Sequence, residues 1–110
     1  MHNLYPGEST NQRCIFKMNN MTREEEILTV LQEECAEVSQ MVCKIRRFGI
    51  DETHLKEGGS NRERLTEEVG DLQAAIDLLK LYNVVDGNEI ELAKQRKFEK
   101  LKRWSRIYET

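Results

Sequence analysis

Two pairs of carboxylates fall in segments whose other regularly spaced residues are apolar. Glu34 and Glu37 lie in QEECAEVSQM, and Glu68 and Asp71 lie in TEEVGDLQAA. The members of each pair are three residues apart, so on a helix they share one face. Carboxylates that face inward are costly unless cations neutralise them. Hard divalent ions such as Mg²⁺ bind oxygen ligands of this kind, so the four residues are predicted to form a metal site between two helices.

The residues around these pairs narrow the choice of metal. The two histidines, His2 and His54, lie in an N-terminal segment and a loop, away from the carboxylates. This argues against zinc and against di-iron sites, which use Glu-x-x-His. All-oxygen ligation predicts Mg²⁺, with Mn²⁺ as an alternative. Glu33 could bind a further ion or act as a general base. A single E-x-x-E pair is more often a solvated helix face, but two pairs that interrupt apolar stripes favour the metal site.

Basic residues in two of the segments predict a phosphate substrate, the usual partner of protein-bound Mg²⁺. Lys44 lies at the end of the first segment. Lys97 lies four residues after Ala93 and four before Leu101, inside an apolar stripe where its ammonium group could reach a phosphate. Solubility and favourable charge at helix C-termini are the alternative explanation for the other cations.

The elements that carry these residues are predicted to be helices, so the fold class is all-α. A capping box, in which Ser, Thr or Asp is followed three residues later by Glu, opens each helix. The boxes pair Thr22 with Glu25, Ser60 with Glu63 and Asp86 with Glu89, and the helices cover about residues 23–48, 61–82 and 87–108. Gly49 is predicted to stop the first helix. The short turn at 83–86 predicts that the last two helices are antiparallel neighbours.

The bulk composition indicates one soluble domain. The chain has 110 residues, of which 34% are charged and 38% apolar, with six glycines and one proline. A net charge of −3 gives no reason to expect a nucleic-acid or membrane partner. No apolar run is long enough to cross a bilayer, and there is no secretory signal pattern. Cys14, Cys35 and Cys43 are expected to be reduced thiols, so a cytoplasmic location is expected. Residues 1–21 are predicted to be irregular.

Three helices of this size make a poor core by themselves. Their apolar stripes are wide and leave apolar surface uncovered. We therefore expect a helical bundle of three main helices that is completed by homo-oligomerisation, as a homodimer or homotetramer.

The combination of EECAE, a helix ending in KIRRFG, a polar loop and EEVGD resembles the MazG-like nucleotide pyrophosphohydrolases, of the all-α NTP pyrophosphatase superfamily. The resemblance covers about residues 24–105 and makes 22–110 the family domain, of the small type found in phages and bacteria. The family's third-helix motif resembles N-x-K-F-x-R-R, and this chain has QRKFEKL. Lys97 matches the motif, Lys100 replaces an arginine and Leu101 departs from it.

The resemblance implies hydrolysis of nucleoside or deoxynucleoside triphosphates to the monophosphate and pyrophosphate, with two or three Mg²⁺ ions. Glu34, Glu37, Glu68 and Asp71 would be the metal ligands. Glu33 or Glu34 would accept the proton of the attacking water, and Lys44, Lys97 and Lys100 would hold phosphates. Such an enzyme would act on the deoxynucleotide pool, with a purine such as dGTP as a candidate substrate, in the host cytoplasm if the chain comes from a phage.

Base selection is not encoded in these motifs. Candidates for base contacts are Gln40, Asn61, Asn83 and Trp104. Two alternatives stay open within the superfamily, namely hydrolysis of phosphoribosyl-ATP or of dUTP. A third is of another class, a helical oligomerisation module without catalysis, which would gain nothing from inward carboxylates.

Overall fold

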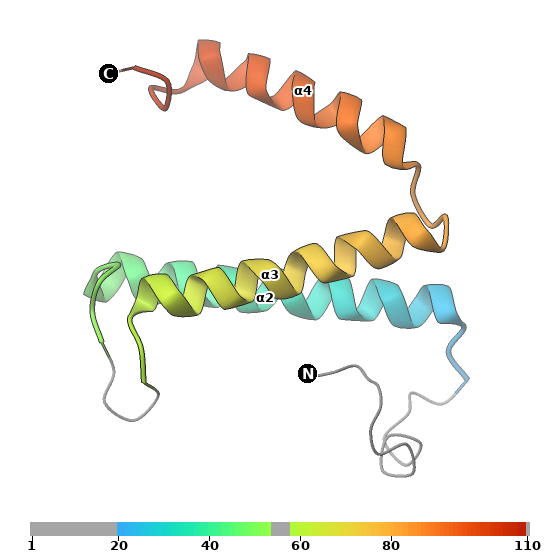
Figure 1. Ribbon diagram of the computed structural model, residues 1–110, viewed down its shortest axis with the longest axis horizontal. Helices are drawn as coiled ribbons and strands as arrows, with labels where there is room; N and C mark the ends of the chain where they lie inside the picture. Colours follow the sequence, from blue (N-terminus) through green and yellow to red (C-terminus); the bar gives the residue numbers. More distant parts are fainter. Residues whose placement is uncertain (1–19, 54–57, 110) are drawn as a thin grey trace.

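The computed structural model describes residues 20–53 and 58–109. Within these ranges the chain forms three helices, and a single isolated bridge between Thr53 and Ser60 is the one β-type pairing. The helices are α2 (Arg23–Phe48), α3 (Asn61–Leu81) and α4 (Gly87–Trp104) (Figure 1). The all-α prediction is confirmed. None of the described helices combines the length and apolarity needed to cross a membrane.

The starts of α2 and α3 follow from their capping boxes. The Thr22 hydroxyl accepts a hydrogen bond from the Glu25 N–H at 3.1 Å, and the Glu25 carboxylate accepts from the Thr22 N–H at 2.8 Å. Ser60 and Glu63 form the same reciprocal pair. Gly49 ends α2 at a φ of 102°, which favours glycine, and its N–H donates to the Ile45 carbonyl. These boundaries match the prediction.

The boundaries of α4 differ from the prediction. The Asp86 carboxylate accepts from the N–H groups of Asn88 and Glu89, without the return bond that completes the other two boxes. The helix ends at Trp104 rather than Tyr108. Ser105 is extended, and its hydroxyl donates to the Leu101 carbonyl at 2.8 Å. A serine that bonds to the preceding turn offers the backbone an alternative to continuing the helix.

An antiparallel hairpin of α2 and α3 forms the body of the fold. Its closed end is held by backbone bonds from Asn61 to Glu52 and from Arg62 to Ile50, at 2.8 and 2.7 Å. The Asn61 amide also donates to the Gly49 carbonyl at 2.9 Å, and the residue is completely buried. Asn61 therefore ties the two helix ends together. Its amide N–H group is used in this contact, although the sequence made Asn61 a candidate for a contact with the base.

The buried side chains lie along the seam between these two helices. They are Ile27, Met41, Asn61, Ala75 and Leu79. Burial of apolar side chains such as Ile27, Met41 and Leu79 supplies most of the hydrophobic stabilisation of a small domain. The core of the described chain is therefore the α2–α3 seam.

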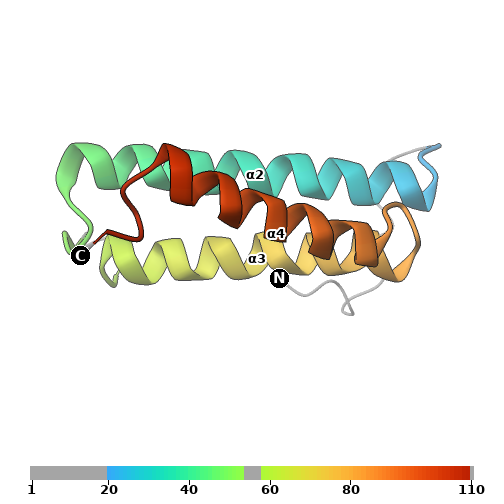
Figure 2. The ribbon, with the colours of Figure 1, turned by 90° about the horizontal axis from the view of Figure 1, so that it is seen from above.

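Helix α4 stands apart from that seam. It contains no buried residue, and α2 with α3 is the one pair of described helices in extensive contact. Figures 1 and 2 show α4 running back above the α2–α3 pair and diverging from α3 toward its C-terminal end. The expectation that the last two helices pack as neighbours is wrong in this respect. The turn that redirects the chain contains Asn83 in the left-handed region, at a φ of 58°.

Replacing Asn61 tests the tie at the closed end. Asn61→Ala removes the hydrogen bond to the Gly49 carbonyl and most of a completely buried side chain, which should lower the free energy of unfolding by about 1–3 kcal/mol. Urea unfolding followed by circular dichroism measures the change. Asn88→Ala, at an exposed site, is the control and should stay within about 0.5 kcal/mol of wild type. Equal effects of the two substitutions would contradict the role given to Asn61.

Candidate metal centre

Each helix of the hairpin places a glutamate in the middle of its buried row. Glu34 lies seven residues after Ile27 and seven before Met41, both of which are buried. Seven residues are about two helical turns, so the three side chains share one face. Glu68 has the same place on α3, midway between two buried residues, and both glutamates are half-buried. Glu34 and Glu68 therefore have the inward position that was predicted for the four carboxylates, whereas Glu37 and Asp71 are exposed.

The hairpin brings three of the four predicted ligands together. Carboxylate oxygens of Glu34, Glu68 and Asp71 all lie within 4.8 Å of one another. We call these three residues the carboxylate cluster. The cluster joins one residue of α2 to two of α3, and Asp71 at its edge is exposed. Glu37 lies beside it, close enough for its charge to act on Glu68.

Burial and mutual repulsion raise the pKa of two members of the cluster. For Glu34, burial has the largest effect on the pKa, followed by the charges of Asp71 and Glu68. For Glu68, burial again leads, followed by the charges of Glu37 and Asp71. Both causes disfavour the ionised form. The metal-free cluster therefore carries an unfavourable concentration of negative charge.

Arg64 is a cation near the cluster that was not predicted from the sequence. Its charge opposes the rise in the pKa of Glu68. It precedes Glu68 by four residues, which places both side chains on one face of α3. This i, i+4 spacing is the signal that could have identified it.

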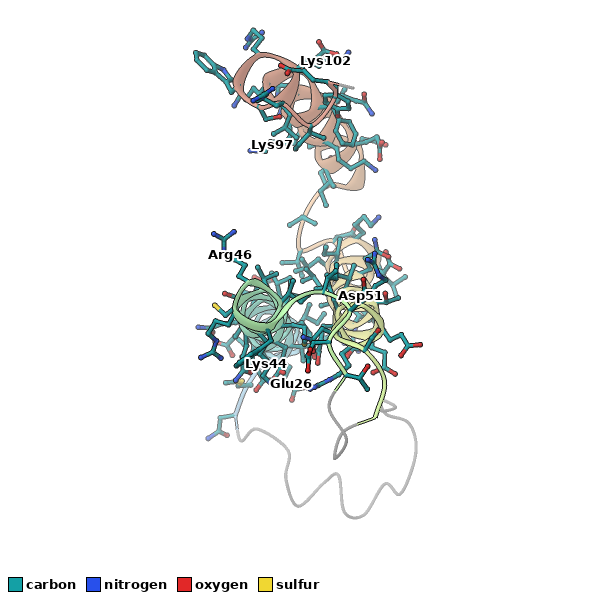
Figure 3. The ribbon with its side chains drawn as sticks, turned by 90° about the vertical axis from the view of Figure 1, so that its left-hand side faces the viewer. Glu26, Lys44, Arg46, Asp51, Lys97 and Lys102 are labelled. Carbon is teal, nitrogen blue, oxygen red and sulfur yellow. The ribbon has the colours of Figure 1, made fainter. Side chains whose placement is uncertain are left out.

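The open side of the cluster faces away from α4. Glu26, Glu33, Glu37 and Lys44 are separated by seven, four and seven residues, and so form one row along α2. Figure 3 shows both ends of the row, Glu26 and Lys44, on the side of the hairpin turned away from α4. The structure therefore puts Glu33 and Lys44 on the same side as Glu37.

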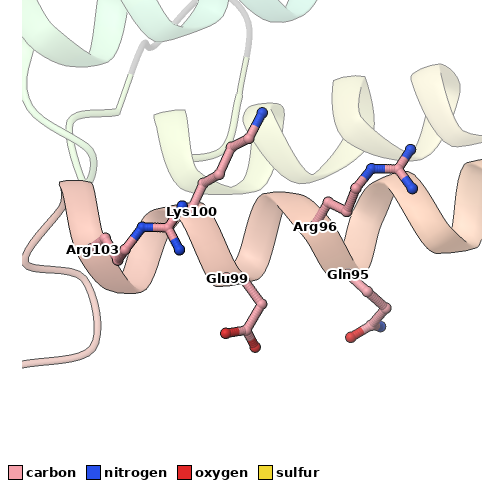
Figure 4. Close-up of a pocket in the computed structure, with 5 residues that line it drawn as sticks. All are labelled: Gln95, Arg96, Glu99, Lys100 and Arg103. Carbon is pink, nitrogen blue, oxygen red and sulfur yellow. The ribbon is translucent and has the colours of Figure 1, made fainter.

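Within one chain, the other predicted phosphate ligands do not reach the cluster. Lys97 lies on the side of α4 that faces the hairpin, opposite the open side of the cluster (Figure 3). Lys100 lines a shallow hollow together with Gln95, Arg96, Glu99 and Arg103 (Figure 4). All five residues belong to α4, so the hollow contains none of the carboxylates. Lys97 and Lys100 do not reach the carboxylates because α4 is separated from the α2–α3 seam.

The donor set suits a hard divalent cation. Two ligand oxygens on opposite sides of Mg²⁺ are about 4.2 Å apart, slightly less than the 4.8 Å limit within which the cluster oxygens lie. A small movement of half-buried or exposed side chains closes this difference. Glu34, Glu68 and Asp71 would hold such an ion, with Glu37 as an adjacent fourth ligand.

Comparison with known proteins adds no further assignment. No family model, no curated protein and no solved structure matches the chain.

The raised pKa values predict how stability depends on pH in EDTA. A carboxyl whose pKa is higher in the folded state binds more protons there than in the unfolded state. The free energy of unfolding should therefore fall as pH rises from the ordinary glutamate pKa of about 4.3 through the raised values of Glu34 and Glu68. Urea unfolding at a series of pH values measures this slope.

Glu34→Gln should flatten the slope and make the metal-free protein more stable near neutral pH, because it removes one half-buried charge from a cluster of like charges. Glu24→Gln, at an exposed site in the first turn of α2, is the matched control and should keep the wild-type slope. An unchanged slope in Glu34→Gln would show that the cluster charges do not oppose folding.

Proposed function

We propose that this protein is a Mg²⁺-dependent pyrophosphohydrolase that converts nucleoside or deoxynucleoside triphosphates to the monophosphate and pyrophosphate. The observation that carries the proposal is the carboxylate cluster, which two helices form in the middle of their buried seam. Repelling charges at that position weaken the hairpin, so their presence calls for a ligand that needs them. A divalent cation is such a ligand, and Mn²⁺ could replace Mg²⁺.

The position of Lys44 on the open side of the cluster supports a phosphate-bearing substrate. Lys44 follows Glu37 by seven residues in the same row, about 10 Å along the helix. An ammonium group at that distance can pair with the distal phosphates of a nucleotide whose α phosphate lies at the cluster. A divalent ion bound there supplies a Lewis acid that draws charge from the phosphoryl oxygens.

Two glutamates have positions suited to accept a proton. In the proposed reaction a water oxygen bonds to the α phosphorus, and the bond to the oxygen that bridges to the β phosphate breaks. The water proton passes to Glu34 or to Glu33, and the pyrophosphate leaves with the electron pair of the broken bond. Glu33 is close enough to Glu34 for its charge to act on the pKa of Glu34, so both carboxylates are near the proposed site.

The choice of the α–β bond rests on the resemblance of EECAE and EEVGD to the MazG-like enzymes. The same resemblance supports the deoxynucleotide pool, including purine nucleotides, as the substrate and a homo-oligomer as the working form. A helical oligomerisation module without catalysis is the competing function, favoured by the apolar side chains left exposed on all three helices.

Metal binding separates these two functions. Millimolar Mg²⁺ or Mn²⁺ should raise the melting temperature, since an ion at about 100 times its Kd stabilises the folded state by about 2.7 kcal/mol. Asp71→Asn and Glu34→Gln should reduce the shift, and the Glu24→Gln control should retain it. Differential scanning calorimetry with and without the ion measures this effect. No shift in wild type would favour the module.

A panel of eight ribo- and deoxynucleoside triphosphates tests the reaction. With Mg²⁺ the products should be monophosphate and pyrophosphate, resolved by ion-exchange chromatography. Glu34→Gln should lower kcat by about 10²–10⁴-fold, the usual contribution of a proton-accepting group, while Glu24→Gln keeps wild-type turnover. Diphosphate with inorganic phosphate as products would exclude cleavage at the α phosphate.

A further inference from the structure

The net charge of −3 is distributed unevenly along the chain. Residues 94–106, which include the C-terminal half of α4, hold seven basic residues and one acidic residue, a net charge of +6. The rest of the chain holds ten basic and nineteen acidic residues, a net charge of −9. All seven basic residues of the segment are exposed. A polyanion is therefore repelled by most of the molecule and attracted to this segment.

Three of the seven cations are neutralised by a carboxylate three residues away along the chain, at 3.0 to 3.2 Å. The pairs are Glu91 with Lys94, Glu99 with Lys102, and Arg106 with Glu109. The other four cations, Arg96, Lys97, Lys100 and Arg103, form no ion pair within the described part of the chain. Lys100 has the other three of them three or four residues away on α4, where like charges repel one another.

Three of the unpaired cations lie along one side of α4. Arg96, Lys100 and Arg103 are spaced by four and three residues, and all of them line the shallow hollow on this helix. Figure 4 shows Arg96 and Lys100 extending to one side of the helix, whereas Gln95 and Glu99 extend to the other. We call the three cations the basic stripe. Its ends are seven residues apart, which is about 10 Å along the helix.

The single tryptophan of the chain lies beside the end of the basic stripe. Trp104 follows Lys100 by four residues, so the two side chains are neighbours on α4. Trp104 is 79% exposed, although its large apolar ring would be stabilised by a covering group. Proteins that bind single-stranded nucleic acid combine basic side chains along the phosphate backbone with an aromatic ring that stacks on a base.

The exposed apolar residues of α4 do not suit a lipid surface. Leu92, Phe98 and Trp104 are 52%, 40% and 79% exposed. They follow one another at intervals of six residues, or one and two-thirds turns, so they point in three directions a third of a turn apart. A helix that lies in the surface of a bilayer needs its apolar side chains on one face. The pattern therefore favours a nucleic acid over a membrane.

We propose that the basic stripe and Trp104 bind single-stranded nucleic acid. Arg96, Lys100 and Arg103 contact phosphates along the strand, and the indole of Trp104 stacks on a base at the end of the contacted segment. Because stacking requires an unpaired base, a duplex is a poorer ligand. The site lies on α4, away from the carboxylate cluster, and it does not depend on the proposed function.

Fluorescence anisotropy of a labelled oligothymidylate measures this binding. The titrations are carried out in EDTA, so that no metal ion at the carboxylate cluster can hold the strand. Three phosphate contacts on a single strand predict a slope of about −2 when log affinity is plotted against log salt concentration. Binding should therefore weaken about 16-fold between about 50 and 200 mM salt. No binding at the lower salt concentration would overturn the proposal.

Paired substitutions test the basic stripe itself. Arg96→Gln combined with Arg103→Gln leaves one of the three contacts, so the affinity at low salt should fall at least about tenfold and the slope should change to about −0.7. Lys94→Gln combined with Lys102→Gln is the matched control, because it removes the same charge from cations that already have ion pairs. The control should keep the wild-type slope. Equal losses in the two variants would overturn the basic stripe as the site.

The fluorescence of Trp104 tests base stacking, since no other residue of the chain contributes an indole signal. Oligothymidylate should quench this fluorescence. Trp104→Leu should weaken single-strand binding by about 5- to 150-fold, the range expected for one stacked base, and leave duplex binding unchanged. Duplex DNA that binds wild type as tightly as the single strand would overturn the role of Trp104.

Two other anions separate a nucleic acid from other partners. Inorganic polyphosphate has no bases, so it should displace oligothymidylate less well than an unlabelled single strand at equal phosphate concentration. Equal displacement would reject the nucleic acid as the ligand. Vesicles that contain phosphatidylserine should leave the emission of Trp104 unchanged. Binding to the vesicles without binding to oligothymidylate would show that the partner is a membrane surface and would overturn the proposal.

Discussion

The seam between α2 and α3 is the constraint on which the rest of the structure depends. It is the one place where the described chain buries side chains, and there are five of them. Glu34 and Glu68 occupy the middle of both rows, where an apolar residue would pack best. The hairpin is therefore held together by apolar side chains on one side of Glu34 and Glu68 and by the hydrogen bonds of Asn61 at its closed end. Between these contacts lies a region of charge repulsion.

This division gives the hairpin two unlike sides. The carboxylates at the edge of the seam, with Glu33, Glu37 and Lys44, make one side polar. Apolar residues spaced by three and four along α2 and α3 make the other side apolar, and Leu28, Val42 and Val69 among them are 36% exposed or more. A single hairpin cannot cover the second side, because both helices already use one face against each other. The chain must therefore obtain the missing layer from α4, from another molecule, or from both.

Local features of the fold were predictable from the sequence, and long-range placement was not. Capping boxes act over three residues, so Thr22 and Ser60 located helix starts correctly. The regular spacing of the apolar residues predicted correctly that Glu34 and Glu68 face inward. The same spacing could not predict the position of α4. An apolar stripe indicates that a helix is covered, but it does not identify the surface that covers it. The sequence predicted that Lys97 could reach a substrate phosphate, whereas the structure puts it on the side of the hairpin opposite the open side of the cluster.

The position of Lys97 connects these observations. A lysine in the centre of an apolar stripe is unfavourable if the stripe packs on an apolar surface, because the ammonium group loses water without gaining a partner. Within one chain, α4 faces such a surface. The carboxylate cluster has an excess of negative charge, because the nearby basic side chains of the described chain do not neutralise it. Lys97 and the carboxylates therefore carry complementary charges that the fold of one chain keeps on opposite sides of the hairpin.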